Sequence, residues 1–276
     1  MGLGCMSLSH AYGTPPSLED GVALVRSALD DGVQLLDTAT LYGGGRNEEL
    51  VGRAIAGRRD EVVLASKGGM ALVDGVKVID GRPETLRAHV DASLRRLGVE
   101  HIDLYYLHRW DKKVPIAESV GALAEMVAAG KIGAIGLSEV SVDRLREALA
   151  AAPIAAVQNE YSLWSRNPEL GILDATRDAG VALVAFSPVG RGYLADSITD
   201  PEQLPPVMEG KPAEALMTSG VIPTARLTIN HRSEARDIPI AGRRVMSGIE
   251  LSPSENVEII REESVEAALA TIKTRF

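Results

Sequence analysis

The feature of this sequence that most constrains its fold is a regular alternation of short apolar runs with longer segments of helical spacing. Most of the runs are four to six residues long and rich in β-branched residues. They are Gly2–Cys5, Gln34–Ala39, Val62–Ser66, Ile102–Leu107, Ala134–Leu137, Ala155–Gln158, Val181–Phe186 and Ile238–Ile240. Because they are apolar nearly throughout, they indicate strands buried on both faces, as in a parallel sheet.

The connecting segments place apolar residues at helical spacing, and capping residues mark several of their ends. Ser17 predicts the N-cap of the first helix, and Gly32 predicts its C-terminal stop. The predicted helices are Leu18–Asp31, Glu49–Ala56, Pro83–Leu97, Ile116–Ala129, Val142–Ala151 and Pro168–Ala179, with a further helix placed at Pro212–Thr218, where the periodicity is weak.

Strands that alternate with helices predict βαβ units and a parallel sheet. A doubly wound sheet would carry a G-x-G-x-x-G turn after its first strand, but Cys5–Leu8 follows that strand here, and Gly43–Gly45 after the second strand lacks the pattern. A (β/α)₈ barrel takes about 250 residues, and the chain has 276. We therefore predict an α/β fold, a (β/α)₈ TIM barrel, as one domain over residues 1–276, with the weakest pattern in 205–237 and 245–276.

Composition excludes several classes of function. The net charge of −9 and the pI of about 5.2 argue against nucleic acid and anionic membrane surfaces as partners. One cysteine, Cys5, allows no intrachain disulfide, and no His/Cys cluster has the spacing of a metal site. The apolar runs are too short to span a bilayer, and the N-terminus does not read as a signal peptide. We expect a cytoplasmic protein that has no metal.

Polar side chains stand where the predicted strands end, which is where the chemistry of a β/α barrel is located. Asp37 ends the second strand, Tyr42 follows it, Lys67 ends the third strand and His108 ends the fourth. Singly, such residues are a helix cap, a packing residue, a surface charge and a structural histidine. Because all four would meet at one barrel mouth, they predict a site that moves protons.

The chemistry of such a site follows from the four side chains. Tyrosine has a pKa of about 10, and a neighbouring ammonium, Lys67, would lower the pKa of Tyr42. Asp37 would keep Lys67 charged, His108 would donate a hydrogen bond to a substrate carbonyl, and Tyr42 would protonate the carbonyl oxygen. No side chain supplies a hydride, so this site requires a cofactor. In the loop Ser187–Gly192, backbone N–H groups could approach a pyrophosphate, and Arg243 with Arg244 could hold a ribose 2′-phosphate.

These residues resemble the aldo-keto reductase superfamily. The resemblance covers most of residues 1–205 and a short piece near Ile238–Arg244. Its most specific segments are Leu36–Ala39 with Tyr42-Gly43, Ala65–Lys67 and Asp103–His108, and further support comes from Gly130–Ser138 and Phe186–Gly192. The resemblance implies a TIM barrel, reduction of a small-molecule carbonyl substrate, and NADPH as the cofactor, or NADH. It also implies that Asp37, Tyr42, Lys67 and His108 form the catalytic tetrad, with Tyr42 as the general acid.

The same resemblance assigns binding residues. Ser138 and Gln158 would bind the nicotinamide carboxamide, Phe186 would stack on the nicotinamide ring, and Met6 would lie near the ribose. The remaining implied cofactor contacts are Ser187, Pro188, Val189, Gly190, Arg191, Gly192, Gly242, Arg243 and Arg244. Trp110 and Trp164 would shape the substrate pocket, or simply pack at the barrel rim.

The sequence departs from the family pattern in three places. Glu139 stands where many members have Asn, no N-terminal hairpin precedes the first strand, and the stretch 205–237 is short, with Glu255-Asn256 too far along to match the usual adenine motif. Two alternatives stay open: a regulatory subunit that binds nicotinamide nucleotide with little turnover, and an aldolase that uses Lys67 as a Schiff-base amine. No pattern in the sequence determines the oligomeric state.

Overall fold

The computed structural model describes residues 1–9, 14–163, 165–190, 225–226 and 258–259, and the chain divides into two units, Met1–Ile198 and Thr199–Phe276. In the second unit, the described residues form one short antiparallel pair, β10 (Ala225–Arg226) with β11 (Glu258–Ile259). The predicted strand Ile238–Ile240 and the predicted helix Pro212–Thr218 lie outside the described residues. The single domain over residues 1–276 therefore stays a prediction.

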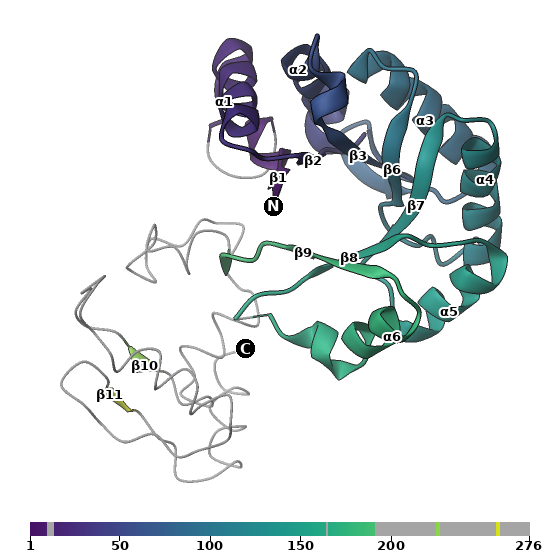
Figure 1. Ribbon diagram of the computed structural model, residues 1–276. Helices are drawn as coiled ribbons and strands as arrows, with labels where there is room; N and C mark the ends of the chain where they lie inside the picture. Colours follow the sequence, from purple (N-terminus) through teal and green to yellow (C-terminus); the bar gives the residue numbers. More distant parts are fainter. Residues whose placement is uncertain (10–13, 164, 191–224, 227–257, 260–276) are drawn as a thin grey trace. The chain divides into compact units, whose positions relative to one another are not determined.

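The first unit contains a seven-stranded sheet in which all neighbouring strands are parallel. Its strand order is β1-β2-β3-β6-β7-β8-β9. The sheet curves, and helices lie along its outer side (Figure 1). The strands are β1 (Gly2–Gly4), β2 (Leu35–Asp37), β3 (Val63–Gly68), β6 (Ile102–Leu107), β7 (Ile132–Ser138), β8 (Ala156–Glu160) and β9 (Ala182–Phe186). The prediction of a parallel α/β sheet with seven strands in this region is confirmed.

The helices lie close to their predicted positions. They are α1 (Leu18–Asp30), α2 (Arg46–Ile55), α3 (Pro83–Leu97), α4 (Ile116–Ala128), α5 (Val142–Ala151) and α6 (Ile172–Asp178). Ser17 caps α1 by accepting a hydrogen bond from the backbone N–H of Asp20, as predicted. The predicted helix Pro168–Ala179 is instead a 3₁₀ turn, Asn167–Leu170, followed by α6, because Gly171 with φ 145° interrupts the helical backbone. No helix in these described ranges is long and apolar enough to cross a membrane.

Alternation along the strands explains why they are apolar on both faces. Leu36, Leu64, Tyr105 and Leu107 belong to the main core, which also contains side chains of the helices. Their neighbours along the strands form a second cluster on the concave face of the sheet: Leu35, Ala65, Leu104, Tyr106, Ala156 and Val184. Tyr106 fills this interior opposite Gly136, where an added Cβ would lie 2.3 Å from the tyrosine ring. Each strand therefore has one face toward the helices and one toward the barrel interior.

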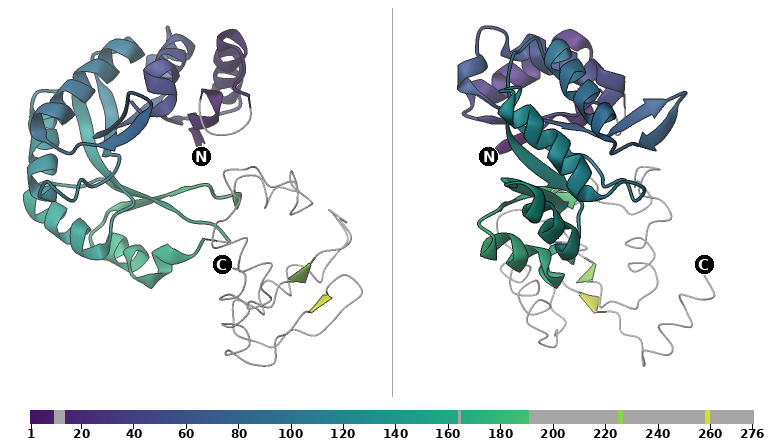
Figure 2. Two further views of the ribbon diagram at one scale, coloured as in Figure 1. Left: turned by 180° about the vertical axis from the view of Figure 1, so that it is seen from behind. Right: turned by 90° about the vertical axis from the view of Figure 1, so that its right-hand side faces the viewer.

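A β-hairpin after β3 was not predicted. Strands β4 (Met70–Val73) and β5 (Val76–Ile79) pair antiparallel through Asp74 and Gly75, which have φ values of 49° and 79°. Asp-Gly between two largely apolar runs is a strong signal for a hairpin turn with two left-handed residues, and this signal was present in the sequence. The hairpin projects from the barrel (Figure 2, right), and its side chains beyond Ala71 are largely exposed.

A buried ion pair supports the turn between β2 and α2. Glu48, on the first turn of α2, is fully buried and accepts hydrogen bonds from Arg96 of α3, at 2.6 Å from Nε, and from Ser66 of β3. The Arg96 side chain lies beneath the turn, because a Cβ added at Gly45 would meet its Nε at 2.7 Å. This pair thus ties two helices and a strand to the segment that precedes α2.

We predict that Glu48→Gln lowers the free energy of unfolding by about 2 to 4 kcal/mol, because it leaves the largely buried Arg96 without its counter-charge. Glu125→Gln is the matched control: it removes the same charge from the exposed pair Arg87–Glu125, for a loss below about 1 kcal/mol. Urea unfolding of both variants measures the difference. Equal losses of unfolding free energy in the two variants would mean that burial does not strengthen the contribution of the Glu48–Arg96 pair to stability.

Candidate active site

The predicted site residues continue the inward-facing rows of the strands. Each stands two positions beyond an interior residue of its own strand, so its side chain points to the same concave side, toward the C-terminal end of the barrel. These pairs are Leu35 and Asp37, Ala65 and Lys67, Tyr106 and His108, Gly136 and Ser138, Ala156 and Gln158, and Val184 and Phe186. The fold therefore brings the strand-end side chains to one place.

Lys67 stands at the centre of this group. Its side chain is 1% exposed, and its ammonium forms an ion pair with Asp37 Oδ1 and donates hydrogen bonds to the Thr38 carbonyl (3.0 Å) and to Tyr42 Oη (3.3 Å). Burial lowers the pKa of Lys67, but the contacts with Asp37 and Tyr42 outweigh burial and raise the pKa above its ordinary value. Lys67 is therefore a charged ammonium, not a neutral amine.

Tyr42 begins a tight turn, Tyr42–Gly45, and the three residues after it have a backbone conformation that favours glycine. Gly43, Gly44 and Gly45 all have positive φ, from 59° to 97°. The turn buries the Tyr42 ring in a small apolar cluster with Ala39 and Leu41, against which Met6 and Met70 pack. Met6 thus lies beside Tyr42, and its predicted position near the ribose of the cofactor stays a prediction.

The pKa of Tyr42 differs from what the sequence argument expected. Burial raises the pKa above its ordinary value, and the positive charge of Lys67 acts in the lowering direction without cancelling the effect of burial. The expected direction of the Lys67 effect is thus present, but the net shift is upward, because 8% exposure leaves the phenolate little contact with water.

His108 completes the set of four. Its ring meets the Tyr42 ring edge to face, with centroids 5.8 Å apart and an interplanar angle of 86°. Burial lowers its pKa well below the ordinary value, and the charges of Lys67 and Arg109 lower it further, so the imidazole is neutral at pH 7. Its buried Nδ1 has no hydrogen-bond partner among the described residues, and a ligand that entered the site could satisfy this atom.

Two amide and hydroxyl groups extend the site along β7 and β8. Gln158 Nε2 donates to Asp37 Oδ2 at 2.8 Å, so Asp37 joins Lys67 to Gln158 across the barrel. Ser138, in register with Gln158, accepts a hydrogen bond from Arg109 Nη1 at 2.8 Å. The hydroxyl of Ser138 and the amide of Gln158 are therefore uncharged groups that could bind a carboxamide. They lie beside the four side chains that the sequence predicts to transfer protons.

The segment after β9 has the backbone of a tight turn. Ser187 has φ 50°, and Gly190 N–H donates to the Ser187 carbonyl at 2.9 Å. Phe186 ends β9 opposite Glu160 of β8, and Pro188 and Val189 are exposed. Pyrophosphate binding by Ser187–Gly190 stays a prediction. The Gly190 N–H is already hydrogen-bonded within the turn, so it is not free for a phosphate. Arg191, Gly192, Gly242, Arg243 and Arg244 lie outside the described residues.

Trp110 contacts the outer layer of helices. Its Nε1 donates to the Val114 carbonyl at 3.0 Å, the Arg144 guanidinium of α5 lies 4.7 Å from the ring centroid, and the side chain packs against the main core. These contacts show how the ring packs, and the substrate role of Trp110 stays a prediction. Trp164 lies outside the described residues.

Two neighbours of the site were missed by the sequence analysis. Arg109, directly after His108, was assigned no role, yet its Nη1 donates a hydrogen bond to Ser138 Oγ. Met70 and the hairpin that it begins lie next to Tyr42. The Asp-Gly turn could have identified the hairpin, but only the parallel register that brings β6 beside β7 shows that Arg109 reaches Ser138.

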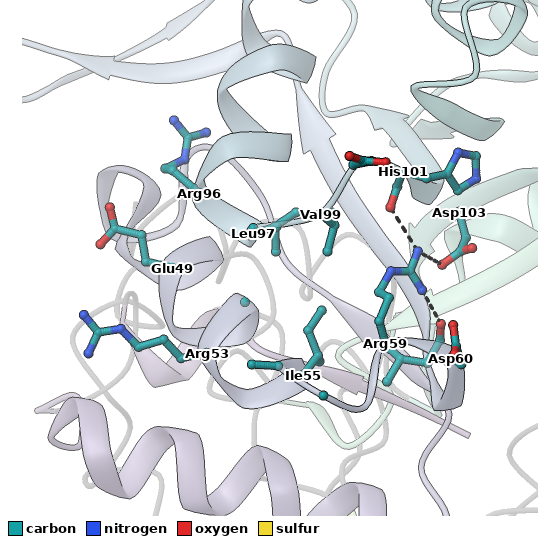
Figure 3. A pocket seen from close by; sticks show the side chains of 16 residues that line it. Glu49, Arg53, Ile55, Arg59, Asp60, Arg96, Leu97, Val99, His101 and Asp103 are labelled. Atoms are coloured by element: carbon teal, nitrogen blue, oxygen red, sulfur yellow. Dashed lines mark hydrogen bonds and ion pairs between the residues drawn. The ribbon is translucent and has the colours of Figure 1, made fainter.

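A cavity of about 990 Å³ lies at the opposite end of the strands (Figure 3). It is lined by the end of α2 and by the residues that lead into β3 and β6, among them Val62 and His101. Arg59 crosses it to Asp103 at 2.7 Å. None of the four tetrad candidates lines it, and the N-terminal face of such barrels contributes to stability, so this cavity is not the candidate active site.

No group of three or more His, Cys, Asp or Glu side chains in the part of the chain that the structure describes could hold a metal ion. Cys5 is a buried free thiol, and burial raises its pKa to about 12. At neutral pH it is therefore not a thiolate that could act as a nucleophile.

Comparison with known proteins shows which family the chain matches. The family model described as "Aldo/keto reductase family" matches residues 1–238. The chain is 44% identical over 196 residues to a probable aldo-keto reductase 1 from Glycine max, an alignment that covers 70% of this chain and 57% of the soybean protein. The chain thus spans little more than half the length of that curated relative.

Solved structures with the same fold include a glycerol dehydrogenase from Gluconobacter oxydans, with TM-score 0.71, 32% identity, and coverage of 79% of this chain and 71% of that one. An aldo-keto reductase from Bacillus halodurans in its holo form has TM-score 0.66 and 26% identity, covering 98% and 91%. One from Klebsiella pneumoniae, in complex with NADP and acetate, has TM-score 0.60 and 25% identity, covering 100% and 90%. The predicted TIM-barrel class is confirmed, and the chain belongs to the aldo/keto reductase family.

Proposed function

We propose that this protein is an NADPH-dependent reductase that converts aldehydes or ketones to alcohols, with Tyr42 as the general acid. The observation that carries the proposal is the position of the Lys67 ammonium, which contacts Asp37 and Tyr42 at once. His108 stands beside the same phenol. Membership of the aldo/keto reductase family supports an oxidoreductase of this kind.

Each side chain of the tetrad has a distinct part in proton transfer. Asp37 keeps Lys67 charged in a buried position, and Lys67 stabilises the phenolate that remains once Tyr42 has given its proton to the carbonyl oxygen. His108, neutral because its pKa is lowered, donates one N–H to the carbonyl oxygen and orients the substrate without adding a charge. The raised pKa of Tyr42 keeps it protonated, which suits an acid in the reduction direction.

The residues present fit a nicotinamide cofactor. NADPH, when bound, supplies the hydride that no side chain can give. Ser138 and Gln158 offer a hydroxyl and an amide at the ends of adjacent strands, and the buried His108 Nδ1 has no partner among the described residues. Phe186 ends the next strand, opposite Glu160, and its ring would stack on the nicotinamide. The Klebsiella relative binds NADP, and we extend the phosphorylated cofactor to this chain.

The protonated state of Lys67 argues against the aldolase alternative. A Schiff-base lysine must lose its proton before it attacks a carbonyl. Here the ammonium bonds to Asp37, Thr38 and Tyr42, and its pKa is raised. The regulatory alternative is a subunit that binds nucleotide with little turnover. Measuring NADPH oxidation with a panel of aldehydes distinguishes it from an active reductase.

We expect Tyr42→Phe to retain NADPH binding and to lose reductase activity by a factor of about 100 or more, because the general acid is removed while the ring that packs in the cluster remains. The loss of NADPH absorbance with a panel of aldehydes measures turnover, and quenching of protein fluorescence measures binding. A parent protein that binds NADPH but reduces no aldehyde would favour the regulatory reading. A Tyr42→Phe variant with parental turnover would exclude Tyr42 as the acid.

Lys67→Met is expected to raise the pKa of Tyr42 further, because it removes the charge that acts in the lowering direction. Alcohol oxidation requires the phenolate, which forms above that pKa, so the rise of the oxidation rate with pH should move to higher pH in the variant. Rates of alcohol oxidation between pH 7 and 11 provide the measurement. The double variant Asp37→Asn/Lys67→Met controls for an unpaired Asp37, and an unshifted profile in both variants would contradict the role of Lys67.

A further inference from the structure

Arg109 is a half-buried cation at the edge of the candidate site. It follows His108 directly, and its Nη1 donates to Ser138 Oγ (2.8 Å) and to the His108 carbonyl (2.6 Å). Across the described ranges, no carboxylate forms an ion pair with it, and only Nη1 donates a hydrogen bond to another residue there. Its Nε and Nη2 groups therefore remain as two parallel donors, the arrangement that binds a carboxylate in bidentate fashion.

The unpredicted hairpin adds a second cation near the same place. Met70 and Ile79 face each other across β4 and β5, as do Leu72 and Lys77, so these four side chains share one face of the hairpin. Met70 packs against the cluster that contains Tyr42, so this face is the one toward the site. Lys77, at the exposed end of that face, forms no ion pair with the described residues.

Arg109 and Lys77 lie near His108 and have no ion-pair partner among the described residues, whereas Lys67 is paired with Asp37; the whole chain carries a net charge of −9. The groups whose charges lower the pKa of His108 are Lys67, Arg109 and Lys77. Two acidic side chains follow β5 and β6, and both already have other partners. Asp80 accepts hydrogen bonds from Arg82 and Thr85. Asp111 accepts hydrogen bonds from the backbone N–H groups of Gly81 and Lys113. Local cations in an acidic protein point to an anionic ligand at this site.

We propose that the site prefers carbonyl substrates that carry a carboxylate, with Arg109 as the specificity-determining residue that binds it. Met70 packs beside the phenol at the base of the hairpin, and Lys77 adds a weaker attraction, because an exposed charge is screened by solvent and salt. The inference rests on the proposed function, since it names the substrate class of the same site.

The test compares two aldehydes, 4-carboxybenzaldehyde and its uncharged methyl ester, methyl 4-formylbenzoate, at pH 7 with saturating NADPH. We expect the parent to favour the carboxylate in kcat/KM by about tenfold or more, the effect of one charge-assisted hydrogen-bonded pair. Arg109→Gln should reduce this ratio by about tenfold, chiefly through the KM of the carboxylate. Lys77→Gln should reduce it by about twofold, and only at low salt.

Arg87→Gln is the matched control, since Arg87 is an exposed arginine that pairs with Glu125 far from the site residues, and it should leave the ratio unchanged. A parent ratio near one would overturn the inference, as would an Arg109→Gln variant that loses both aldehydes equally. If Arg109→Gln instead weakens NADPH binding and spares the ratio, its anionic partner is a phosphate of the cofactor, and the inference is wrong.

Failure of the proposed function would look different. A parent protein that oxidises no NADPH with either aldehyde contradicts the reductase assignment itself. Calorimetric binding of the two aldehydes to the NADPH complex then still tests the inference. Tighter binding of the carboxylate, lost in Arg109→Gln, supports it, and equal binding overturns it.

Discussion

The site depends on one buried ion pair, between Lys67 and Asp37. An ammonium that is 1% exposed is stable only with a counter-charge and hydrogen bonds for its protons. Asp37, the Thr38 carbonyl and Tyr42 meet that requirement, and all three come from β2 and the loop after it. The pair therefore holds the loop that carries the proposed acid against the end of β3, while Gln158 fixes the other oxygen of Asp37 from across the barrel.

Two opposing effects set the acidity of Tyr42. Burial raises its pKa and the Lys67 charge lowers it, and in this structure burial is the larger. A phenol with a raised pKa holds its proton at neutral pH, and its conjugate base is stabilised by a fixed cation once the proton has gone. At His108, burial and the neighbouring cations act together and both lower the pKa. The imidazole is therefore uncharged and would orient a carbonyl by hydrogen bonding alone.

Much of this could be predicted from the sequence because barrel geometry converts strand ends into neighbours. Asp37, Lys67 and His108 are far apart in the chain. Because side chains alternate along a strand, each of the three points to the same side as the interior residue two positions before it. The net pKa of Tyr42 could not be predicted, because it depends on how deeply the ring is buried. The hairpin was missed although Asp74-Gly75 encoded its turn. The contact of Arg109 with Ser138 required the register of β6 and β7. The contacts of Trp110 depend on how α5 packs.

The central claim, that Lys67 is a permanent ammonium held by Asp37, can be measured directly. In protein labelled with ¹⁵N-lysine, the side-chain nitrogen resonance that disappears in Lys67→Met belongs to Lys67, and its shift reports its protonation as pH is varied. The account predicts that this nitrogen remains an ammonium beyond the ordinary lysine pKa of about 10.4. A Lys67 that loses its proton near pH 7 would contradict the ion pair, the tuning of Tyr42 and the proton-transfer scheme built on them.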